Sequence, residues 1–250
     1  GDNKGSLYEG TIADFTSDHL GQAAAGELGR WDPKTSDTDP KGAALVAIQK
    51  ALEAPDEELE TALGKVCNID KFIRFWALET FVGHTDGYTS NRNNFYVYFD
   101  PTDGDRAVFI PWGTDNVFGD GGSADGPFEF SRFQFAELPR RFSRIPSLRA
   151  RYELEVQRIL DDVWDEEAML SRIETWRVMV ATAQDDPKFN AAMKELRKWV
   201  EQRRSKVVAA LLEGVPAGDA EPRPCSAMPG GALAIGGDAL EWMTLFTFAW

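Results

Sequence analysis

The sequence predicts an α+β domain in which the helical part is dominant. Strand-like residues gather in the first half of the chain around one hairpin, whereas residues 136–213 have a helical spacing of apolar side chains. Strands and helices do not alternate, and no Gly-rich phosphate-binding motif is present, so a Rossmann sheet is not expected. We expect one domain over residues 1–213, with residues 214–250 as a linker and a tail that could begin a further segment.

The first quarter of the chain is expected to contain one short strand and two helices. Residues 6–10 (SLYEG) are strand-like, and residues 15–40 are rich in Asp, Gly, Thr and Pro, which predicts a loop with little helix. Residues 41–54 have helical apolar spacing, and residues 56–66 begin with an acidic turn that suits a helix N-terminus.

A further helix, which begins after Asn68, is expected to lie at the centre of the domain. Asn68 is expected to cap its N-terminus, because Asn side chains accept hydrogen bonds from backbone N–H groups that lack helical partners. The helix is too apolar for a surface position. The residues that indicate burial are Ile69, Phe72, Ile73, Trp76, Leu78 and Phe81.

A β-hairpin follows this helix. Residues 94–100 (NFYVYFD) and 106–112 (RAVFIPW) are strand-like, and the Asp-Gly pair in the connecting PTDGD is a strong hairpin signal. Antiparallel pairing would bring Asn94 and Asp115 to the same end of the hairpin. The remaining expected elements are a polar loop at residues 119–126 and helices at residues 148–164 and 187–214.

The composition limits the possible partners. The 250 residues are 43% hydrophobic and 27% charged, as in globular proteins, and the net charge of −14 argues against nucleic acid or an anionic membrane surface. No apolar run approaches the ~20 residues that span a bilayer. No signal peptide is visible, although the abrupt start at GDNKGSLYEG suggests a fragment that could have lost one.

Cys67 and Cys225 are the two cysteines, and their separation fits no zinc or redox spacing. The sequence is compatible with two buried thiols and with one disulfide between them.

Two polar loops flank the hairpin and carry the residues with the clearest chemistry. In GHTDGYTSNRNNFYVY (residues 83–98), Asp86 is followed five residues later by Asn91, which is the spacing of the protein-kinase catalytic loop. Phosphoryl transfer needs a carboxylate near the attacking hydroxyl and oxygen ligands that hold a divalent metal on the phosphates. Asp86 could be that carboxylate, with Asn91 or Asn94 as a ligand. Asp115, in the second loop PWGTDNVFGD, could bind the same metal.

GHTDGYTSNRNNFYVY followed by RAVFIPWGTDNVFGD resembles the CotH kinase family, the spore-coat-protein-H type of atypical protein kinase. The upstream GSLYEG and NIDKFIRFWALETFVGHTD are also similar to what precedes the active-site loop in bacterial members. The resemblance is dense over residues 68–120, plausible over residues 1–67 and generic beyond residue 135.

The resemblance implies a divergent kinase-like fold that consists mostly of the helical large lobe, with the β-hairpin carrying the active-site loops. It implies a secreted or cell-envelope-associated enzyme that uses ATP and Mg2+ or Mn2+ to phosphorylate Ser or Thr in a protein. Asp86 falls at the position of the catalytic-loop aspartate, and Asp115 at that of the metal-binding aspartate. Asn91 has the expected spacing from Asp86 and Asn94 directly precedes the aromatic strand, so either could be the other metal ligand.

Two departures from the family pattern lower the expected activity. The family commonly has Trp-Asp-Leu-Asp where this chain has Trp112, Gly113, Thr114 and Asp115, so one of two acidic positions is absent. The chain is also expected to be N-terminally truncated, because it begins downstream of the family's small lobe, where the residues that position ATP would lie. The alternative function is therefore a non-catalytic extracellular binding module on the same fold.

Other polar residues have simpler interpretations. The Asp and Asn side chains of both loops could be caps of ordinary turns. Residues 100–105 (DPTDGD) could bind calcium in a calcium-stabilised extracellular domain, but a hairpin turn is favoured because the other ligands of an EF-hand are missing. His84 is expected to shape the loop by hydrogen bonding, and His19 is expected to be solvated. Because no nucleophile elbow is present, a Ser-His-Asp hydrolase is not expected.

Several arginines could contact phosphate or an acidic substrate, but pairing with neighbouring carboxylates is favoured. They are Arg132, Arg140, Arg141, Arg144, Arg149 and Arg151.

Overall fold

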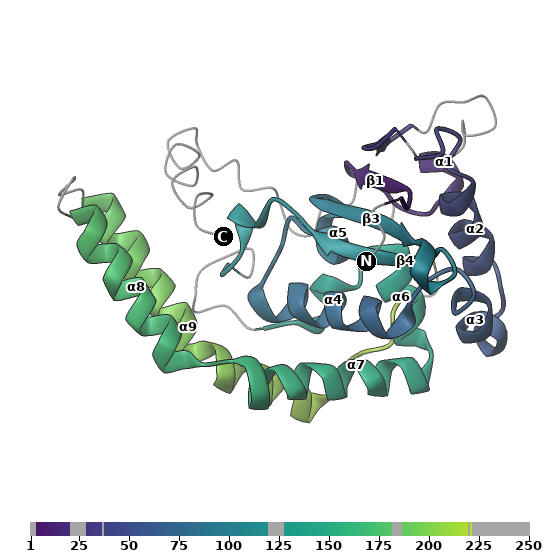
Figure 1. The fold of residues 1–250 in the computed structure, drawn as a ribbon. Coiled ribbons are helices and arrows are strands. Elements are labelled where there is room, and N and C mark those ends of the chain that lie inside the picture. Colours follow the sequence, from purple (N-terminus) through teal and green to yellow (C-terminus); the bar gives the residue numbers. More distant parts are fainter. Residues whose placement is uncertain are drawn as a thin grey trace.

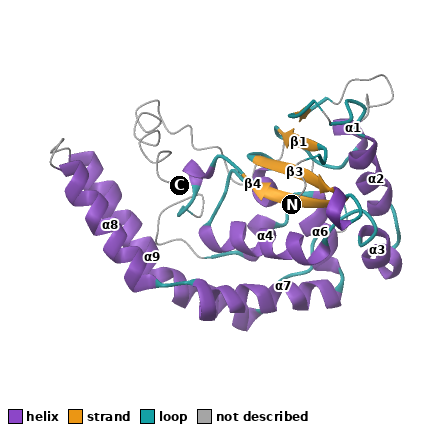
Figure 2. Cartoon of the chain, in the orientation of Figure 1, coloured by secondary structure: helices purple, strands orange, loops and turns teal. Residues whose placement is uncertain are grey.

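The computed structural model confirms a mixed architecture of helices and one sheet. Figure 1 and Figure 2 show helices beneath and beside a small antiparallel sheet, in keeping with the predicted α+β class. The residues that the structure describes are 4–20, 29–36, 38–119, 128–181, 187–219 and 221.

The sheet has the strand order β2–β1–β3–β4 and is antiparallel throughout. β3 (Phe95–Asp100) and β4 (Arg106–Pro111) form the predicted hairpin. β1 (Leu7–Gly10) pairs with the other side of β3, and β2 (Trp31–Pro33) pairs with β1 at the outer edge. Alternate residues of β3 are buried, as the period of two in its sequence predicts.

Residues 15–40 contain more regular structure than their composition predicts. α1 (Ser17–Leu20) is one helical turn, and β2 is a strand of three residues. The prediction of a loop was wrong at β2 because three residues cannot show alternation and because Pro33 argues against a strand. Proline is accepted here since β2 lies at the edge of the sheet.

α4 (Ile69–Val82) is the central helix, as predicted. The Asn68 side chain caps it by accepting a hydrogen bond from the backbone N–H of Lys71 (3.1 Å). One face of α4 packs on the sheet, and α7 (Pro146–Arg158) packs on α4 from the other side (Figure 1). The residues expected to be buried lie in the core or pack against it, except Leu78, whose side chain is 41% exposed.

The remaining helices surround this core. α8 (Glu166–Ala181) and α9 (Pro187–Glu213) lie side by side and extend away from the sheet (Figure 1), with a second apolar cluster between them. α9 confirms the long helix predicted from residue 187. The helix predicted at residues 148–164 is α7 continued by a π-helical turn, Ile159–Val163. The other helices are α2 (Ala43–Leu52), α3 (Asp56–Leu63), α5 (Tyr88–Asn91) and α6 (Glu137–Arg144), with 3-10 turns at Pro101–Asp103, Thr114–Asn116 and Phe130–Phe133.

The first residues after α9 lie on the domain. The backbone N–H of Val215 donates to the Glu153 carboxylate (3.0 Å), and the Gln134 side chain donates to the Pro216 carbonyl (2.9 Å). Arg140 donates to the Asp219 carbonyl (2.7 Å). Residues 220 and 222–250 of the predicted tail lie outside the described residues, as does most of the polar loop predicted at residues 119–126.

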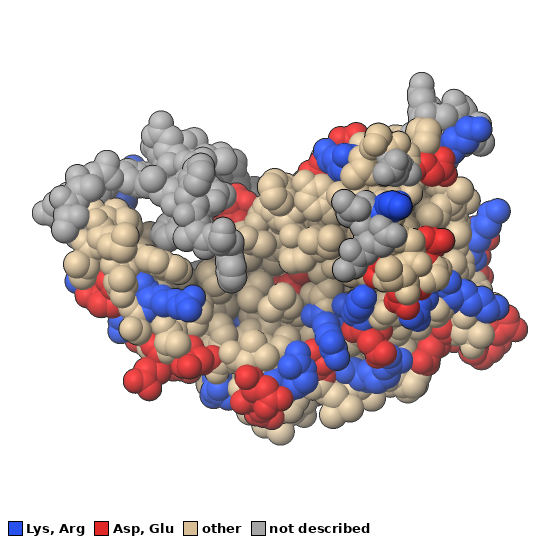
Figure 3. Space-filling model, in the orientation of Figure 1, with Lys and Arg blue, Asp and Glu red and all other residues tan. Residues whose placement is uncertain are grey.

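Charged side chains of both signs lie on the surface, and Cys67 lies in the core. On the face drawn in Figure 3, basic and acidic side chains are interspersed and no single basic patch forms. Within the described ranges, no helix has the length and apolar character to cross a membrane. Cys67 is a free thiol in the core, where burial raises its pKa to about 12, and Cys225 lies outside the described residues.

Candidate active site

The loop after α4 changes direction sharply before the chain enters β3. Gly83 ends α4 in the left-handed conformation (φ 66°), and the short helix α5 follows. Arg92 (φ 59°) and Asn94 (φ 53°) are also left-handed, although neither is glycine. Such residues are uncommon, and their clustering is typical of functional sites.

Asp86 lies at the centre of a polar cluster in this loop. Its half-buried carboxylate accepts hydrogen bonds from the Nδ2 atoms of Asn91 (2.6 Å) and Asn94 (2.7 Å), and a longer one from Asn93 (3.3 Å). An ionised carboxylate only accepts hydrogen bonds, so the amide nitrogens face Asp86 and the amide oxygens of Asn91 and Asn94 point away from it. The structure thus brings together three of the four predicted site residues.

The second predicted loop meets the first at Asn94. The backbone N–H of Trp112 donates to the Asn94 carbonyl (2.9 Å), so the hairpin returns the chain to this end as predicted. Gly113 is left-handed (φ 53°), and a Cβ there would lie 2.7 Å from Cγ and Oδ1 of Asn94, so this arrangement requires glycine. Asp115 lies two residues further on, on an exposed 3-10 turn. Within the part of the chain that the structure describes, its carboxylate has no hydrogen-bond or ion-pair partner, so it flanks the cluster without contacting it.

Glu79 holds the first loop in place from within α4, and sequence reasoning missed it. Its side chain is 2% exposed and accepts hydrogen bonds from the backbone N–H groups of Tyr88 (3.1 Å) and Thr89 (2.9 Å) and from the Thr89 hydroxyl (2.8 Å). These N–H groups belong to the first turn of α5 and have no helical partners. The available signal was a carboxylate on a helix predicted to be buried, because a buried carboxylate needs partners.

His84 connects the two loops. Its buried ring contacts the Glu79 carboxylate through Nδ1 (3.4 Å) and the Gly113 carbonyl through Nε2 (3.3 Å). Burial lowers the pKa of His84, but the hydrogen bond and charge of Glu79 and the Gly113 carbonyl outweigh burial and raise the pKa above its ordinary value. A protonated ring donates from both nitrogens, which suits both contacts. The predicted loop-shaping hydrogen bonds of His84 are therefore confirmed.

His19 is buried, and the prediction that it is solvated was wrong. Its Nδ1 accepts a hydrogen bond from the backbone N–H of Asp14 (2.8 Å). Burial, with the positive charges of Arg30 and Arg92, lowers the pKa of His19 to about 4. The acidic and polar sequence around His19 suggested exposure, whereas α1 folds the ring onto the backbone of residue 14.

Asp14 gives the domain a testable pH dependence. Its carboxylate is 2% exposed, and burial raises its pKa from 3.8 to about 6, although Arg92 and two backbone N–H groups oppose the shift. Between these values the folded state keeps a proton that the unfolded state releases, so the stability contributed by Asp14 falls as pH rises, by about 3 kcal/mol in total. In Asp14→Asn this dependence is absent. Urea titrations give the free energy of unfolding of each protein. The value for the wild type minus that for the variant should fall by about 3 kcal/mol between about pH 3.5 and about pH 7. A difference that does not change with pH would contradict the raised pKa of Asp14.

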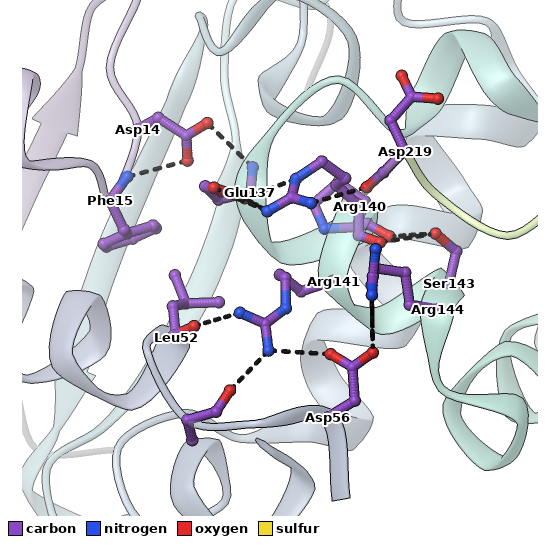
Figure 4. A network of polar contacts seen from close by, with 12 residues as sticks. Asp14, Phe15, Leu52, Asp56, Glu137, Arg140, Arg141, Ser143, Arg144 and Asp219 are labelled. Carbon is purple, nitrogen blue, oxygen red and sulfur yellow. Dashed lines mark hydrogen bonds and ion pairs between the residues drawn. The ribbon is translucent and has the colours of Figure 1, made fainter. Parts of the chain in front are cut away.

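The clustered arginines pair with carboxylates and carbonyls, as the sequence favoured. Figure 4 shows Arg141 and Arg144 converging on Asp56, each with a guanidinium nitrogen 3.1 Å from a carboxylate oxygen. Arg140 pairs with Glu137 (2.6 Å). These contacts join α6 to α3 and to its own first turn, which gives the arginines a structural role. The other pairs are Arg132 with Glu129, Arg149 with the Ser143 carbonyl, and Arg151 with Glu60 and Asp70.

Residues 100–105 form the favoured hairpin turn. Asp100 accepts hydrogen bonds from the backbone N–H (2.9 Å) and hydroxyl (2.6 Å) of Thr102, and Asp103 forms an ion pair with Arg106. These carboxylates are therefore used within the turn. Across the described ranges, no three His, Cys, Asp or Glu side chains are grouped so that they could hold a metal ion.

The fold and the two loops define a class of protein: an α+β domain in which a buried helix ends in an Asp–Asn loop that a β-hairpin joins to a second, acidic loop. The sequence profile of a family described as CotH kinase protein matches residues 1–207. The chain therefore belongs to the CotH kinase protein family.

Similar curated proteins come from Rhizopus delemar. Invasin CotH3 is 29% identical over 145 residues, which are 55% of this chain and 23% of the relative. Invasin CotH2 is 27% identical over 143 residues, or 55% of this chain and 24% of the relative. Spore coat protein homolog 1 is 30% identical over 87 residues, or 35% and 14%. The matched segments thus span 24% or less of the length of these relatives.

Proposed function

We propose that the chain is an ATP- and metal-dependent protein Ser/Thr kinase of the CotH type, built on a kinase-like fold. The observation that carries this proposal is the Asp86 carboxylate bound by the Asn91 and Asn94 amides, with the second loop returned to Asn94 by the hairpin. Phosphoryl transfer depends mainly on positioning and on charge stabilisation, which a carboxylate and nearby oxygen ligands can supply.

Each residue has a defined role in this proposal. Asp86 orients the acceptor hydroxyl and accepts its proton, and the amides that bind Asp86 fix the direction of its oxygens. The amide oxygens of Asn91 and Asn94 and the Asp115 carboxylate would hold Mg2+ or Mn2+, because both ions prefer hard oxygen ligands. When bound, the ion supplies positive charge for the ATP phosphates in a chain whose net charge is −14.

An aromatic surface beside the loops supports a nucleotide as the ligand. Trp112 is 53% exposed, and its ring centroid lies 5.6 Å from that of Tyr96. Trp112 directly precedes Gly113 and donates its backbone N–H to the Asn94 carbonyl (2.9 Å), and Tyr96 follows Asn94 by two residues, so the two aromatic residues are close in sequence to both loops. Exposed aromatic faces of this kind can stack on a purine base.

The acceptor and the location are inferred from the family and its relatives. The family description, CotH kinase protein, supports a kinase, and the resemblance of the two loops to that family implies a Ser or Thr side chain of a protein as acceptor. The names of the relatives, invasins and a spore coat protein homolog, support secretion or association with the cell envelope.

The alternative is a non-catalytic extracellular binding module on the same fold. Gly113 stands where the family commonly has an acidic residue, and the close approach of Asn94 leaves no room there for a side chain. Two of the relatives are named invasins. Asp115 also lacks a contact with the Asp86 cluster.

The experiment that tests the proposal is a thermal-shift titration with ATP, with and without Mg2+ or Mn2+. At a ligand concentration about ten times Kd, metal and ATP together should raise Tm by about 3–6 °C, and Asp115→Ala should abolish the rise. Asp162→Ala removes an exposed carboxylate on the turn after α7 and should keep it. If neither ATP with metal nor ATP alone shifts Tm in the wild type, the binding module becomes the better proposal.

A further inference from the structure

An N-terminal segment far from the polar loop in sequence lies directly against it. We call this segment, residues 12–14, the clamp. The backbone N–H of Ala13 donates to the Arg92 carbonyl (2.7 Å), and the backbone N–H of Ile12 donates to the side-chain oxygen of Asn93 (3.3 Å). The clamp thus contacts the two residues that lie between Asn91 and Asn94.

Backbone conformation on both sides of this contact is unusual. Ile12 has φ 47°, and it contacts Asn93, which lies in sequence between Arg92 (φ 59°) and Asn94 (φ 53°). A left-handed β-branched residue is a true outlier, and such conformations persist only where the surroundings enforce them. The backbone hydrogen bonds of the clamp are part of those surroundings.

Asp14 connects the clamp to two further elements. Its Oδ1 atom accepts hydrogen bonds from its neighbour Phe15 (2.9 Å) and from the hydroxyl of Tyr88 (3.0 Å). Its Oδ2 atom accepts one from the backbone N–H of Glu137 (3.0 Å), the first residue of α6, and lies 3.8 Å from the Arg92 guanidinium. Figure 4 shows the carboxylate between the Phe15 and Glu137 backbones.

Tyr88 carries this connection into the polar loop. It is the first residue of α5, is fully buried, and donates its backbone N–H to Glu79 while its hydroxyl donates to Asp14. Two buried carboxylates therefore hold one residue from opposite ends. α5 ends at Asn91, so the position of Tyr88 sets where that amide meets Asp86.

We propose that Asp14 is a positioning residue of the site, which acts through Tyr88 and the clamp to hold the Asp86–Asn91–Asn94 cluster in its working geometry. This inference rests on the proposed kinase function. Asp14 touches none of the three cluster residues, so its substitution leaves their chemistry intact and changes only their placement. A displacement of about 1 Å can lower turnover by about 100-fold.

The test compares Asp14→Asn, Tyr88→Phe and the double variant with the wild type, using Mn2+ and ATP as probes. Both single variants should lower kcat for ADP formation from ATP by about 10- to 100-fold with little change in KM for ATP, and the double variant should lose no more than the worse single variant. Tyr152→Phe is the matched control, because it removes a buried tyrosine hydroxyl that donates to the Thr80 side chain of α4 (2.8 Å) and not to a residue of the loop. It should leave kcat unchanged.

Three results would overturn the inference: unchanged kcat in Asp14→Asn, additive losses in the double variant, or an equal loss in Tyr152→Phe. If the wild type neither binds nor turns over Mn2+ and ATP, the proposed function fails, and amide hydrogen exchange then decides on the clamp alone. Faster exchange of residues 88–94 in Asp14→Asn and Tyr88→Phe, but not in Tyr152→Phe, supports the clamp, and unchanged exchange refutes it.

Discussion

Replacing Glu79 with alanine is expected to lower the free energy of unfolding by about 3–5 kcal/mol, because it removes one partner of a buried, hydrogen-bonded ion pair. The substitution leaves two backbone N–H groups and the Thr89 hydroxyl without their acceptor, and each unsatisfied buried donor costs about 1–3 kcal/mol. It also leaves the buried ring of His84 without the carboxylate that favours its charged form. Urea unfolding followed by tryptophan fluorescence measures the loss.

The pH dependence of this loss identifies the His84 contribution. Because the pKa of His84 is raised in the folded state, its ion pair contributes stability that is complete below the ordinary value of 6.5 and is lost as pH rises through the folded pKa. The cost of Glu79→Ala should therefore be larger below pH 6.5 than at alkaline pH.

Two variants control for the loss of a carboxylate from α4. Asp70→Ala removes an exposed side chain of the same helix whose ion pair with Arg151 is screened by water, so its effect should be far smaller. Glu79→Gln keeps the shape of the side chain but turns an amide nitrogen toward a donor, so an intermediate loss of about 1–3 kcal/mol is expected. Equal costs for Glu79→Ala and Asp70→Ala would show that Glu79 does not hold the loop.

Elements with a long repeated pattern could be predicted from the sequence, and short elements could not. α4 and α9 each contain several turns in which apolar residues recur at helical spacing, and Asn68 marks the start of α4. β2 has three residues and becomes a strand because β1 offers it an edge to pair with. Its structure is therefore decided by a tertiary contact that its own composition does not encode.

The same division applies to the candidate site. Asp86, Asn91 and Asn94 lie in one loop, so their spacing and turn chemistry were enough to select them as candidate site residues. Glu79 and Asp14 support that loop from a helix and from a segment 74 residues before Tyr88. Glu79 is one carboxylate within an apolar helix, and Asp14 belongs to no pattern in the sequence, so only the packing of both against α5 shows their role.

Replacing Asp86 with asparagine is expected to lower ATP turnover by about 10²- to 10⁴-fold, the usual contribution of a group that accepts a proton in the transition state. The amide cannot accept the proton of an attacking hydroxyl, and it offers one oxygen to the Asn91 and Asn94 amides where the carboxylate offers two. Binding of Mn2+ and ATP should persist, because the proposed ligands are Asn91, Asn94 and Asp115. ADP formation gives the turnover, and calorimetric titration gives the affinity.

The control for this charge change is Asp105→Asn, in the exposed turn between β3 and β4. Asp105 has φ 56°, a conformation that asparagine also tolerates, so the fold and the turnover should both be preserved. Unchanged turnover in Asp86→Asn would remove Asp86 from the chemistry. Turnover and metal-dependent binding lost together would assign Asp86 to the metal instead, because a residue that only handles the proton lowers kcat without weakening the complex that precedes it. The kinase proposal therefore depends on separating these two losses in one variant.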